Sequence, residues 1–419
     1  MIDRFKKTYY EFPRQFWVIV GTSFIDGIGN TMVFPFFALY ITQKFDVGMT
    51  QAGILLGTFS LAGLVGGGFG GALTDKLGRR KLILFGLVFS AISSILLGVT
   101  NSLLLMYPIS VMIGFIGSLA GPAHGAMIAD ILPEEKRSEG FGILRVVGNM
   151  TWIIGPTIAG FVASKSFLAL FLTDAVISCI VALIVYRFIH ETKPQTPEGH
   201  QEQTMAQTMG GYGKVFRDFP FIAFILSSIL MGLVYLQMYG SLSVFLRDNY
   251  GIDPQGYGIL MSTSAITVIL FQFWTTHQIK TRPPFQMMAL GAIFYAIGFT
   301  LFGFVGTFVL FALNIVIITI GEMIVMPTSQ TLVAGFAPED MRGRYMAISG
   351  LAWAIPQTIG PGMAGYILDN YNPNLLWYIG GILTLISVLG FFLLHLRLGA
   401  RPQFAPAPIE SNSLQAATD

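Results

Sequence analysis

The sequence predicts an all-α integral membrane protein with twelve transmembrane helices in two pseudo-symmetric six-helix bundles. Three observations predict this fold class: the composition, the spacing of the apolar stretches and an internal repeat. Of the 419 residues, 53% are hydrophobic and 11% are charged, and the mean hydropathy is +0.68. A water-soluble fold of this composition would expose a very large apolar surface. We therefore expect the protein to fold in a lipid bilayer.

Twelve apolar stretches are long enough for a membrane-spanning helix, which needs roughly 20 residues. Their approximate cores are 15–41, 51–74, 82–100, 103–129, 140–164, 167–189, 220–246, 256–279, 285–305, 308–334, 344–368 and 375–396. The first is far longer than the apolar region of a signal peptide and has no small-residue cleavage site after it. It is therefore expected to be the first membrane span.

A long polar segment, 191–218, lies between the sixth and seventh stretches, and we expect a flexible cytoplasmic linker there. It separates an N-terminal six-helix bundle, 1–190, from a C-terminal bundle, 219–398. The tail, 399–419, is rich in Pro, Ala and Ser and is predicted to be disordered in the cytoplasm.

The Lys and Arg residues predict the orientation, because cytoplasmic loops retain positive charge during insertion. With both termini inside, 20 of the 24 basic residues fall on the cytoplasmic side and 3 on the other, and Arg145 is left within a span. An odd number of spans would spoil this pattern. We expect a multi-pass protein of the inner or plasma membrane.

An internal repeat supports the two-bundle architecture. A shift of 205 residues superimposes 122–160 on 327–365 without a gap, and 11 of the 39 positions are identical. Biased composition alone would give about three or four identities, so a duplicated unit is the better explanation. Parallel repeats are typical of transporters in which the substrate binds between the halves and the halves rock against each other.

Several classes of protein are disfavoured. The net charge of +2 and the scattered basic residues do not suggest a nucleic-acid partner. The single cysteine, Cys179, lies in an apolar run and cannot form a disulfide framework or a cysteine metal site. The chain contains no P-loop, no His-Glu-x-x-His motif and no nucleophile elbow, which argues against an ATP-driven pump or a hydrolase. We expect no enzyme activity, cofactor or metal, and a monomer.

The loop between the second and third stretches carries a motif formed by Gly71, Asp75, Gly78, Arg79 and Arg80. It resembles the signature loop of the major facilitator superfamily, Gly-x-Leu-x-Asp-x-x-Gly-Arg-[Arg/Lys]. The resemblance implies the major facilitator fold and a conformational latch at the cytoplasmic side. Within that latch it implies that Asp75 docks on the start of helix 11 and that Arg79 pairs with Asp130, at the inner end of helix 4.

The fifth stretch contains Gly155, Pro156 and Gly160, and the eleventh repeats them as Gly360, Pro361 and Gly365. Proline bends a helix and small residues four apart allow close backbone approach, so tight packing is expected at both places. The first motif resembles the Gly-Pro-x-x-Gly-Gly sequence of the superfamily's antiporters, with Ala159 replacing the first of the paired glycines. This resemblance favours export over uptake.

Three acids are expected at membrane depth, where a charge costs roughly 2.5–3.5 kcal/mol and needs a partner or a role. They are Asp26, Asp174 and Glu322. Asp26 and Glu322 fall near the midplane of helices 1 and 10, which line the central cavity in the superfamily, and we interpret them as proton-coupling groups. For Asp26, pairing with Arg145 or satisfaction by Asn30 is the competing interpretation. Asp174 lies on a helix that usually packs outside the cavity, so a structural role is favoured.

The segment 321–332 is similar to helix 10 of the lactococcal-type multidrug antiporters, in which the glutamate takes part in proton coupling and cation binding. This similarity implies the same role for Glu322. The alternative is a structural hydrogen bond to a neighbouring helix. Two further acids of those antiporters are replaced here, one near Tyr239 and one by Arg145.

Residues around these acids predict a binding surface for loosely specified amphipathic molecules, because aromatic and Met side chains adapt to varied shapes. Arg145 and Asn149 share one helix face, and Arg145 can meet either Asp26 or an anionic substrate. The candidate substrate-binding residues are Asn30, Phe34, Phe115, Arg145, Asn149, Tyr235, Met238, Tyr239, Met326 and Trp353.

Taken together, these features predict a proton-driven antiporter that exports small amphipathic or cationic molecules by alternating access. Its partners would be that substrate, protons and the lipid bilayer. Two alternatives remain open at this point. One is a proton-coupled symporter or facilitator of a sugar or organic acid, in which Arg145 holds an anionic group. The other is a lipid flippase.

Overall fold

All regular structure in the described residues is helical. The structure, a computed structural model, describes residues 9–193, 213–338 and 341–404. The elements of the first half are α2 (Arg14–Val33), η1 (Phe34–Phe36), α3 (Phe37–Phe45), α4 (Met49–Leu77), α5 (Arg79–Val99), α6 (Leu103–Ser118), α7 (Gly121–Ile131), α8 (Glu134–Ala163) and α9 (Phe167–Phe188). Those of the second half are α11 (Phe219–Tyr235), α12 (Gln237–Gly240), α13 (Leu242–Tyr250), α14 (Pro254–Ile279), α15 (Pro284–Leu301), α16 (Phe308–Phe336), α17 (Arg342–Ser349), α18 (Leu351–Asn370), α19 (Leu375–Leu398) and η3 (Pro402–Phe404).

Within these residues, eleven helical stretches are long and apolar enough to cross a membrane. Some consist of consecutive pieces. For example, α2, η1 and α3 form one stretch, Arg14–Phe45, because Pro35 lacks a backbone N–H and a short 3₁₀ turn forms around it. The twelfth expected span, 344–368, falls on α17 and α18 and is not among the eleven. The run of Pro, Gln, Thr and Gly at 356–362 lowers its hydropathy, so this span is helical but less apolar than the others.

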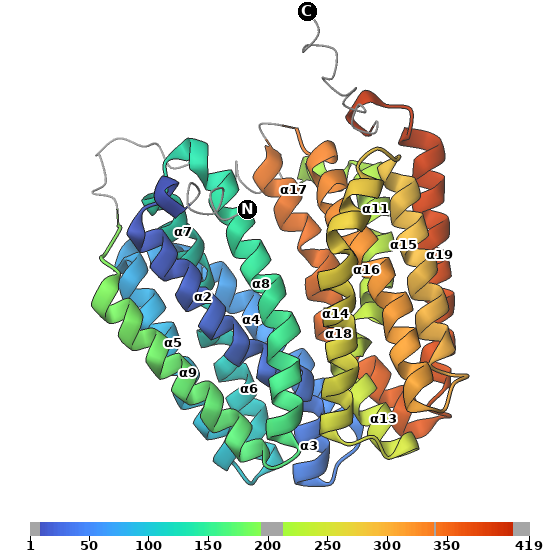
Figure 1. Ribbon diagram of the computed structural model, residues 1–419, viewed down its shortest axis with the longest axis horizontal. Helices are drawn as coiled ribbons and strands as arrows, with labels where there is room; N and C mark the ends of the chain where they lie inside the picture. Colours follow the sequence, from blue (N-terminus) through green and yellow to red (C-terminus); the bar gives the residue numbers. More distant parts are fainter. Residues whose placement is uncertain (1–8, 194–212, 339–340, 405–419) are drawn as a thin grey trace, which may run out of the picture. The chain divides into compact units, whose positions relative to one another are not determined.

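The described residues fall into two compact units. Of the described residues, unit 1 comprises 9–193, 236–265 and 357–372. Within it, α9 packs on both α2 and α5, α8 packs on α2, and α6 packs on α4. Figure 1 shows α2, α5 and α9 side by side. Unit 2 comprises 213–235, 266–338, 341–356 and 373–404. There α15 packs on α16 and α19, and α11 packs on α19.

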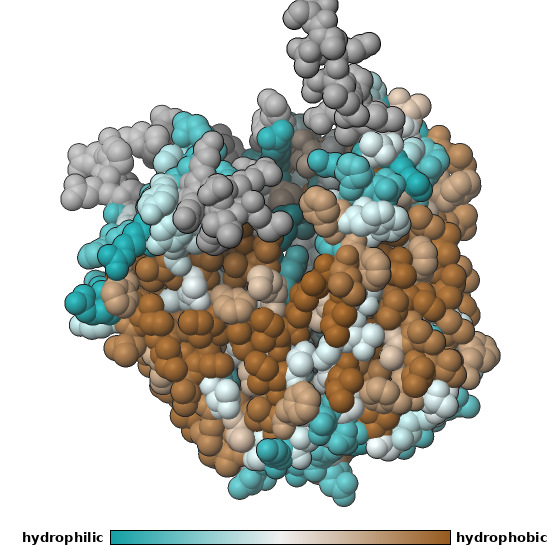
Figure 2. Space-filling model, viewed as in Figure 1, coloured by the Kyte–Doolittle hydropathy of each residue, from teal (hydrophilic) through white to brown (hydrophobic). Residues whose placement is uncertain are grey.

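The surface of the helices suits a lipid environment. Large apolar side chains such as Phe85, Val88 and Ile92 are about half exposed along one side of α5. Figure 2 shows apolar residues along the middle of the helices and polar residues gathered at their ends. Because a bilayer is apolar in its centre and polar at both surfaces, this pattern is expected for membrane-spanning helices.

Within unit 1, the end of α18 lies very close to the start of α4. A Cβ atom added at Gly53 would collide with the carbonyl oxygen of Pro361, and one added at Gly57 with that of Thr358. Further along, a Cβ atom at Gly365 would lie 2.5 Å from the backbone of Met49. The Gly-Pro motif of the eleventh stretch therefore permits close helix packing, as its small residues suggest.

The same two helices are joined by a carboxylate. Asp369, at the end of α18, accepts hydrogen bonds from the backbone N–H groups of Met49 at 2.8 Å and Thr50 at 2.7 Å. These N–H groups belong to the first turn of α4, where no partner exists within the helix and negative charge is favoured. Asp369 thus supplies an N-terminal cap that the side chains of α4 itself do not provide.

The Gly-Pro motif of the fifth stretch also lies at helix crossings. A Cβ atom at Gly155 would collide with the Thr31 hydroxyl on α2, and one at Gly160 would lie 2.8 Å from the Cα atom of Gly258 on α14. Despite Pro156, α8 continues without interruption from Glu134 to Ala163.

The first residues of the expected disordered tail are ordered. Residues 402–404 form η3, and Phe404 is buried against Phe285 and Phe336, with ring centroids 5.1 and 4.8 Å apart. The prediction was wrong for this piece because its one aromatic side chain packs against other aromatic rings. Residues 405–419, and 194–212 of the expected linker, lie outside the described residues.

Candidate functional site

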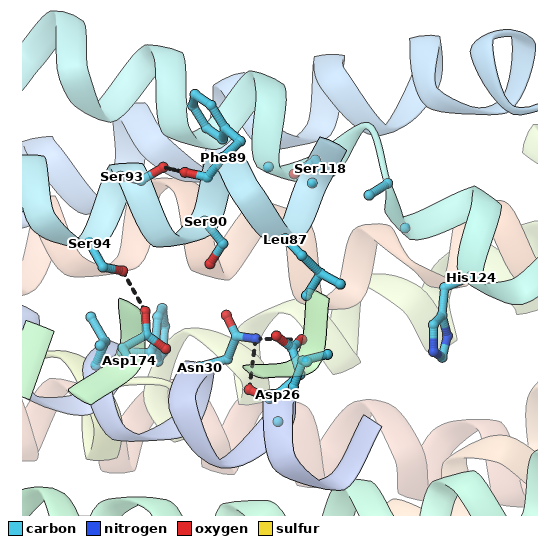
Figure 3. A pocket seen from close by; sticks show the side chains of 18 of the residues that line it. Asp26, Asn30, Leu87, Phe89, Ser90, Ser93, Ser94, Ser118, His124 and Asp174 are labelled. Atoms are coloured by element: carbon cyan, nitrogen blue, oxygen red, sulfur yellow. Dashed lines mark hydrogen bonds between the residues drawn. The ribbon is translucent and has the colours of Figure 1, made fainter. Parts of the chain in front are cut away.

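A cavity of about 800 Å³ lies within unit 1. Its walls are formed mainly by α2, α5, α6, α7 and α9, with smaller contributions from α4, α8 and α18. Polar side chains gather on one part of the wall, where α2, α5 and α9 meet (Figure 3). Apolar residues such as Leu87, Val181 and Val185 line the rest.

Asp26 projects into this cavity from α2. The Nδ2 atom of Asn30, one turn further along the helix, donates to the carboxylate of Asp26 and to its backbone carbonyl, each at 3.1 Å. Within the described residues no salt bridge to Asp26 is present. Of the two interpretations that the sequence allowed for a partner, the structure thus has Asn30 and not Arg145.

Asp174 lines the same cavity from α9 and is only 5% exposed. The Ser94 hydroxyl on α5 donates to its Oδ2 atom, and its Oδ1 atom lies so close to Gly29 on α2 that an added Cβ would collide with it. Its helix was expected to pack outside the cavity, and the structure instead places Asp174 in the cavity wall. The structural role that the sequence favours stays a prediction. Because α9 packs directly on α2 and α5, its polar face is turned toward them.

His124 lies further along the cavity on α7. A ring nitrogen, Nε2, is 3.0 Å from the Ser23 hydroxyl on α2, so a hydrogen bond ties these two helices together. This bond indicates a structural role for His124 at the contact between α2 and α7.

An aromatic group adjoins the polar part of the cavity. Phe34 and Trp152 both line it, with ring centroids 6.2 Å apart, and Trp152 contacts Tyr239 edge to face at 4.9 Å. Met238 is completely buried, and its carbonyl accepts a hydrogen bond from the Tyr257 hydroxyl. Trp152 was missed, since from sequence alone it is one of many aromatic residues in apolar stretches.

Three sequence candidates of unit 1 lie elsewhere. Phe115 does not line the cavity, because its ring packs at 5.9 Å from Phe69 where α6 crosses α4. Arg145 and Asn149 are exposed on α8 and are not part of the cavity wall either.

Glu322 belongs to unit 2, on α16. Its carboxyl group is hydrogen-bonded to Tyr235. The Oε2 atom is buried and, in the described part of the chain, has no hydrogen-bond partner. An oxygen in that situation costs free energy at membrane depth unless a proton or a ligand cation neutralises the group.

Aromatic rings surround the partner of this carboxyl group. Tyr235 stacks on Tyr295 with centroids 5.3 Å apart and meets Trp353 edge to face at 5.9 Å. Met326 lies one turn beyond Glu322 on the same helix and is partly buried. Unit 2 therefore brings together four candidates: Glu322, Tyr235, Trp353 and Met326.

The signature loop is built around Arg79 at the start of α5. Its Nε atom lies 2.9 Å from Oδ2 of Asp130, on α7, and the Thr192 hydroxyl donates to the same oxygen at 3.2 Å. Arg79 is 8% exposed, so this ion pair is largely sheltered from water. The structure thus brings the basic and acidic partners of the expected latch together.

Glu191, which sequence reasoning missed, holds the same loop. Its Oε1 atom accepts hydrogen bonds from the backbone N–H groups of Arg79 (2.8 Å), Arg80 (3.4 Å), Thr192 (3.1 Å) and Lys193 (3.2 Å). Burial opposes ionisation of Glu191, but these N–H donors hold the pKa of its carboxyl below the ordinary value of 4.5. The sequence signal that could have identified Glu191 is its position, an acid directly after a membrane span in a protein with a basic loop at the same surface.

Gly78 is required beside this carboxylate. Its φ is +95°, which other residues rarely adopt, and a Cβ atom there would lie 2.6 Å from Glu191. Arg80 donates to the carbonyl of Tyr186 at 2.5 Å, and Gly71 has open space beside it. The side chain of Asp75 lies outside the described part, so its docking on helix 11 stays a prediction.

Among the described residues no cluster of three or more His, Cys, Asp and Glu side chains could hold a metal ion. The acids at membrane depth instead form two separate sites. One is the pair Asp26 and Asp174 in the cavity of unit 1, and the other is Glu322 with its aromatic neighbours in unit 2.

A family model described as Major Facilitator Superfamily matches residues 19–361 and 237–416. The chain is 27% identical over 373 residues to a Na⁺, Li⁺, K⁺/H⁺ antiporter of Planococcus maritimus, covering 82% of this chain and 87% of that protein. It is 24% identical over 359 residues to the quinolone resistance protein NorA of Staphylococcus aureus strain COL, covering 85% and 90%.

Solved structures share the fold. A POT family transporter in complex with 5-aminolevulinic acid superimposes with a TM-score of 0.79 at 16% identity, covering 93% of this chain and 97% of that one. A mutant of the nucleoside transporter NupG gives 0.74 at 15% identity, covering 91% and 100%.

Proposed function

Since the chain belongs to the Major Facilitator Superfamily, we propose that it is a proton-coupled antiporter that exports small amphipathic or cationic molecules by alternating access. Both termini face the cytoplasm in this proposal. The observation that carries it is the buried Oε2 atom of Glu322, for which no hydrogen-bond donor is present in the described part of the chain.

The chemistry of this carboxyl group suits exchange between a proton and a cation. When Glu322 is ionised, Tyr235 donates to one part of the carboxylate and the buried Oε2 atom is left without compensation. A bound proton removes the charge, and so does a ligand cation placed beside it. The two occupants therefore compete for one group, which is the requirement for antiport.

The aromatic rings near Glu322 favour an organic cation as the competing ligand. The ring of Tyr235 lies 5.3 Å from that of Tyr295 and 5.9 Å from that of Trp353. Aromatic faces attract cations while offering a large apolar surface. Two relatives, a cation/proton antiporter and a quinolone resistance protein, support the same class of function.

A reconstituted transport assay tests the proposal. Purified protein is reconstituted in liposomes with an acidic lumen, and a fluorescent cationic dye is added outside. Protein molecules whose cytoplasmic face points outward should then move dye into the lumen as protons leave it. We expect dye accumulation that a protonophore abolishes. Glu322→Gln should lose this gradient-driven accumulation but retain dye exchange without a gradient.

The matched control is Glu139→Gln, because Glu139 is a surface carboxylate whose side chain is 47% exposed. It should accumulate dye as the wild type does. Full gradient-driven accumulation by Glu322→Gln would contradict the proposal. Saturable entry of a sugar or organic acid with protons would replace it with a symporter, and movement of labelled lipid without dye transport would replace it with a flippase.

A further inference from the structure

Three helices of unit 1 each carry two polar residues, spaced four apart, at the polar part of the cavity, and all of them except Ser178 line its wall. Residues four apart share a helix face. The pairs are Asp26 and Asn30 on α2, Ser90 and Ser94 on α5, and Asp174 and Ser178 on α9. Two hydrogen bonds join α5 to α9 in register, from Ser94 to Asp174 and from Ser178 to Ser90 at 3.2 Å.

The hydrogen-bond pattern leaves oxygen lone pairs facing the cavity. Asn30 directs its amide hydrogens to Asp26, so its Oδ1 atom is available as an acceptor. Figure 3 shows this oxygen turned away from Asp26, on the side of Asp174 and Ser90. Ser94 uses its hydrogen on Asp174 and likewise keeps acceptor lone pairs.

Among the described residues of the cavity wall, no Lys or Arg compensates the charge at this point. The Oδ1 atom of Asp174 packs against Gly29, which lies between Asp26 and Asn30 on α2. The only other titratable group of the described wall is His124, which is bonded to Ser23. Two acids at membrane depth need a neutralising partner, because an unpaired buried charge is costly.

An independent observation points to a ligand in the same cavity. Ser110 on α6 lines the cavity and is only 2% exposed. In the described part of the chain its hydroxyl has no hydrogen-bond partner. Because a buried hydroxyl is normally satisfied, an occupant of the cavity is the natural partner.

We propose that these groups form a binding site for a monovalent alkali cation, Na⁺ or Li⁺, coordinated by Asp26, Asn30, Ser94 and Asp174. Hard cations prefer oxygen ligands, and oxygen atoms are what this site presents. A divalent ion is disfavoured because the described residues contain no cluster of three or more His, Cys, Asp or Glu side chains. The site goes beyond the proposed export function and does not involve Glu322.

Binding of radioactive Na⁺ to the purified full chain in detergent tests this site. At mildly alkaline pH, with choline keeping the ionic strength constant, wild type should bind Na⁺ saturably, and Li⁺ and protons should displace it. Asp174→Asn should weaken Na⁺ binding by about tenfold or more, as removal of a supporting metal ligand does. Asp248→Asn, at a half-exposed carboxylate outside the cavity, should bind as the wild type does.

Ser94→Ala provides a second variant in case Asp174→Asn does not fold. Its control is Ser387→Ala, because Ser387 is also buried and its hydroxyl donates to the carbonyl of Leu383 in its own helix. Ser94→Ala should weaken Na⁺ binding while Ser387→Ala should not. The site is refuted if wild type binds no Na⁺ above the choline background, if Ca²⁺ or Mg²⁺ displaces Na⁺ more effectively than Li⁺, or if neither cavity variant weakens binding. Dye accumulation in the liposome assay is measured separately, so loss of this site leaves the export proposal intact.

Discussion

The acids of the two units differ in their surroundings. In unit 1, Asp26 and Asp174 share a cavity with serine hydroxyls and the amide of Asn30. In unit 2, Glu322 has one tyrosine partner, aromatic neighbours and an oxygen without a donor in the described residues. The difference indicates that a carboxyl group at membrane depth takes its role from its neighbours. An oxygen-rich site suits a small hard cation, and an aromatic one suits an organic cation.

The local sequences account for this contrast. Helix α5 has serines at 90, 93 and 94, which fall on the side facing α9 and the cavity. Around Glu322, α16 is almost wholly apolar, and Gly321 allows close contact with α15, since a Cβ atom there would lie 2.8 Å from the carbonyl oxygen of Gly291. Glu322 therefore lies at a tight helix crossing, with few polar residues around it on α16.

The largest expected effect separates the two acids by what they bind. Glu322→Gln should weaken equilibrium binding of the cationic dye by about tenfold or more, equal to about 1.4 kcal/mol, because the counter-charge is lost. Asp26→Asn should leave both the dye affinity and the gradient-driven accumulation nearly unchanged, because Asp26 belongs to the cavity of unit 1. Dye fluorescence titration on purified protein measures the affinities, and the liposome assay measures accumulation. Dye affinity that depends more on Asp26 than on Glu322 would reverse the comparison.

Steric substitution on α2 gives the next largest effect. A Cβ atom at Gly29 would collide with Asp174, so Gly29→Ala should lower the free energy of unfolding by about 1–3 kcal/mol, as overpacking does, and weaken Na⁺ binding. Gly21→Ala on the same helix is the control, because nothing lies within 4 Å of that position. It should be neutral or stabilising, by up to about 1 kcal/mol. Thermal unfolding of both variants, with and without Na⁺, checks this, and equal behaviour would contradict the close packing of Asp174.

A smaller effect is expected for Tyr235→Phe, which removes the hydroxyl bonded to Glu322 but keeps the ring. Loss of a hydrogen bond to a charged group costs about 1.5–3 kcal/mol when both groups are buried, and here it should favour the protonated form of Glu322. The pH at which gradient-driven accumulation is half maximal should therefore rise. The matched control is Tyr295→Phe, which removes a hydroxyl from another buried tyrosine. A shift of the same size in Tyr295→Phe would show that the effect is general to the aromatic cluster.

The smallest expected effect concerns Glu191. Its folded pKa is lowered, so the ionised carboxylate contributes stability above the ordinary value of 4.5, and this contribution disappears as the pH falls through the lowered folded value. Glu191→Gln should unfold at a lower temperature than wild type at neutral pH. The difference should close below pH 4.5. A difference that grows on acidification would contradict the hydrogen bonds assigned to Glu191.

Much of the architecture could be predicted from the sequence, because helix length, hydropathy and loop charge are local properties. The proximity of Arg79 and Asp130 also followed, since the loop motif carries it. Glu191, Asp369 and the inward direction of Asp174 could not be predicted in this way. Their partners lie far away in the chain, as when Asp369 caps the first turn of α4, and only the packing of distant helices brings them together.

Proton release on ligand binding tests the central claim most directly, because that claim is that Glu322 exchanges a proton for a cationic ligand. Purified protein in weakly buffered solution is mixed with the dye, and a pH indicator counts the protons released. Wild type should release about one proton for each dye molecule bound, and Glu322→Gln should bind dye weakly and release none. Undiminished release per bound dye in Glu322→Gln would contradict the account.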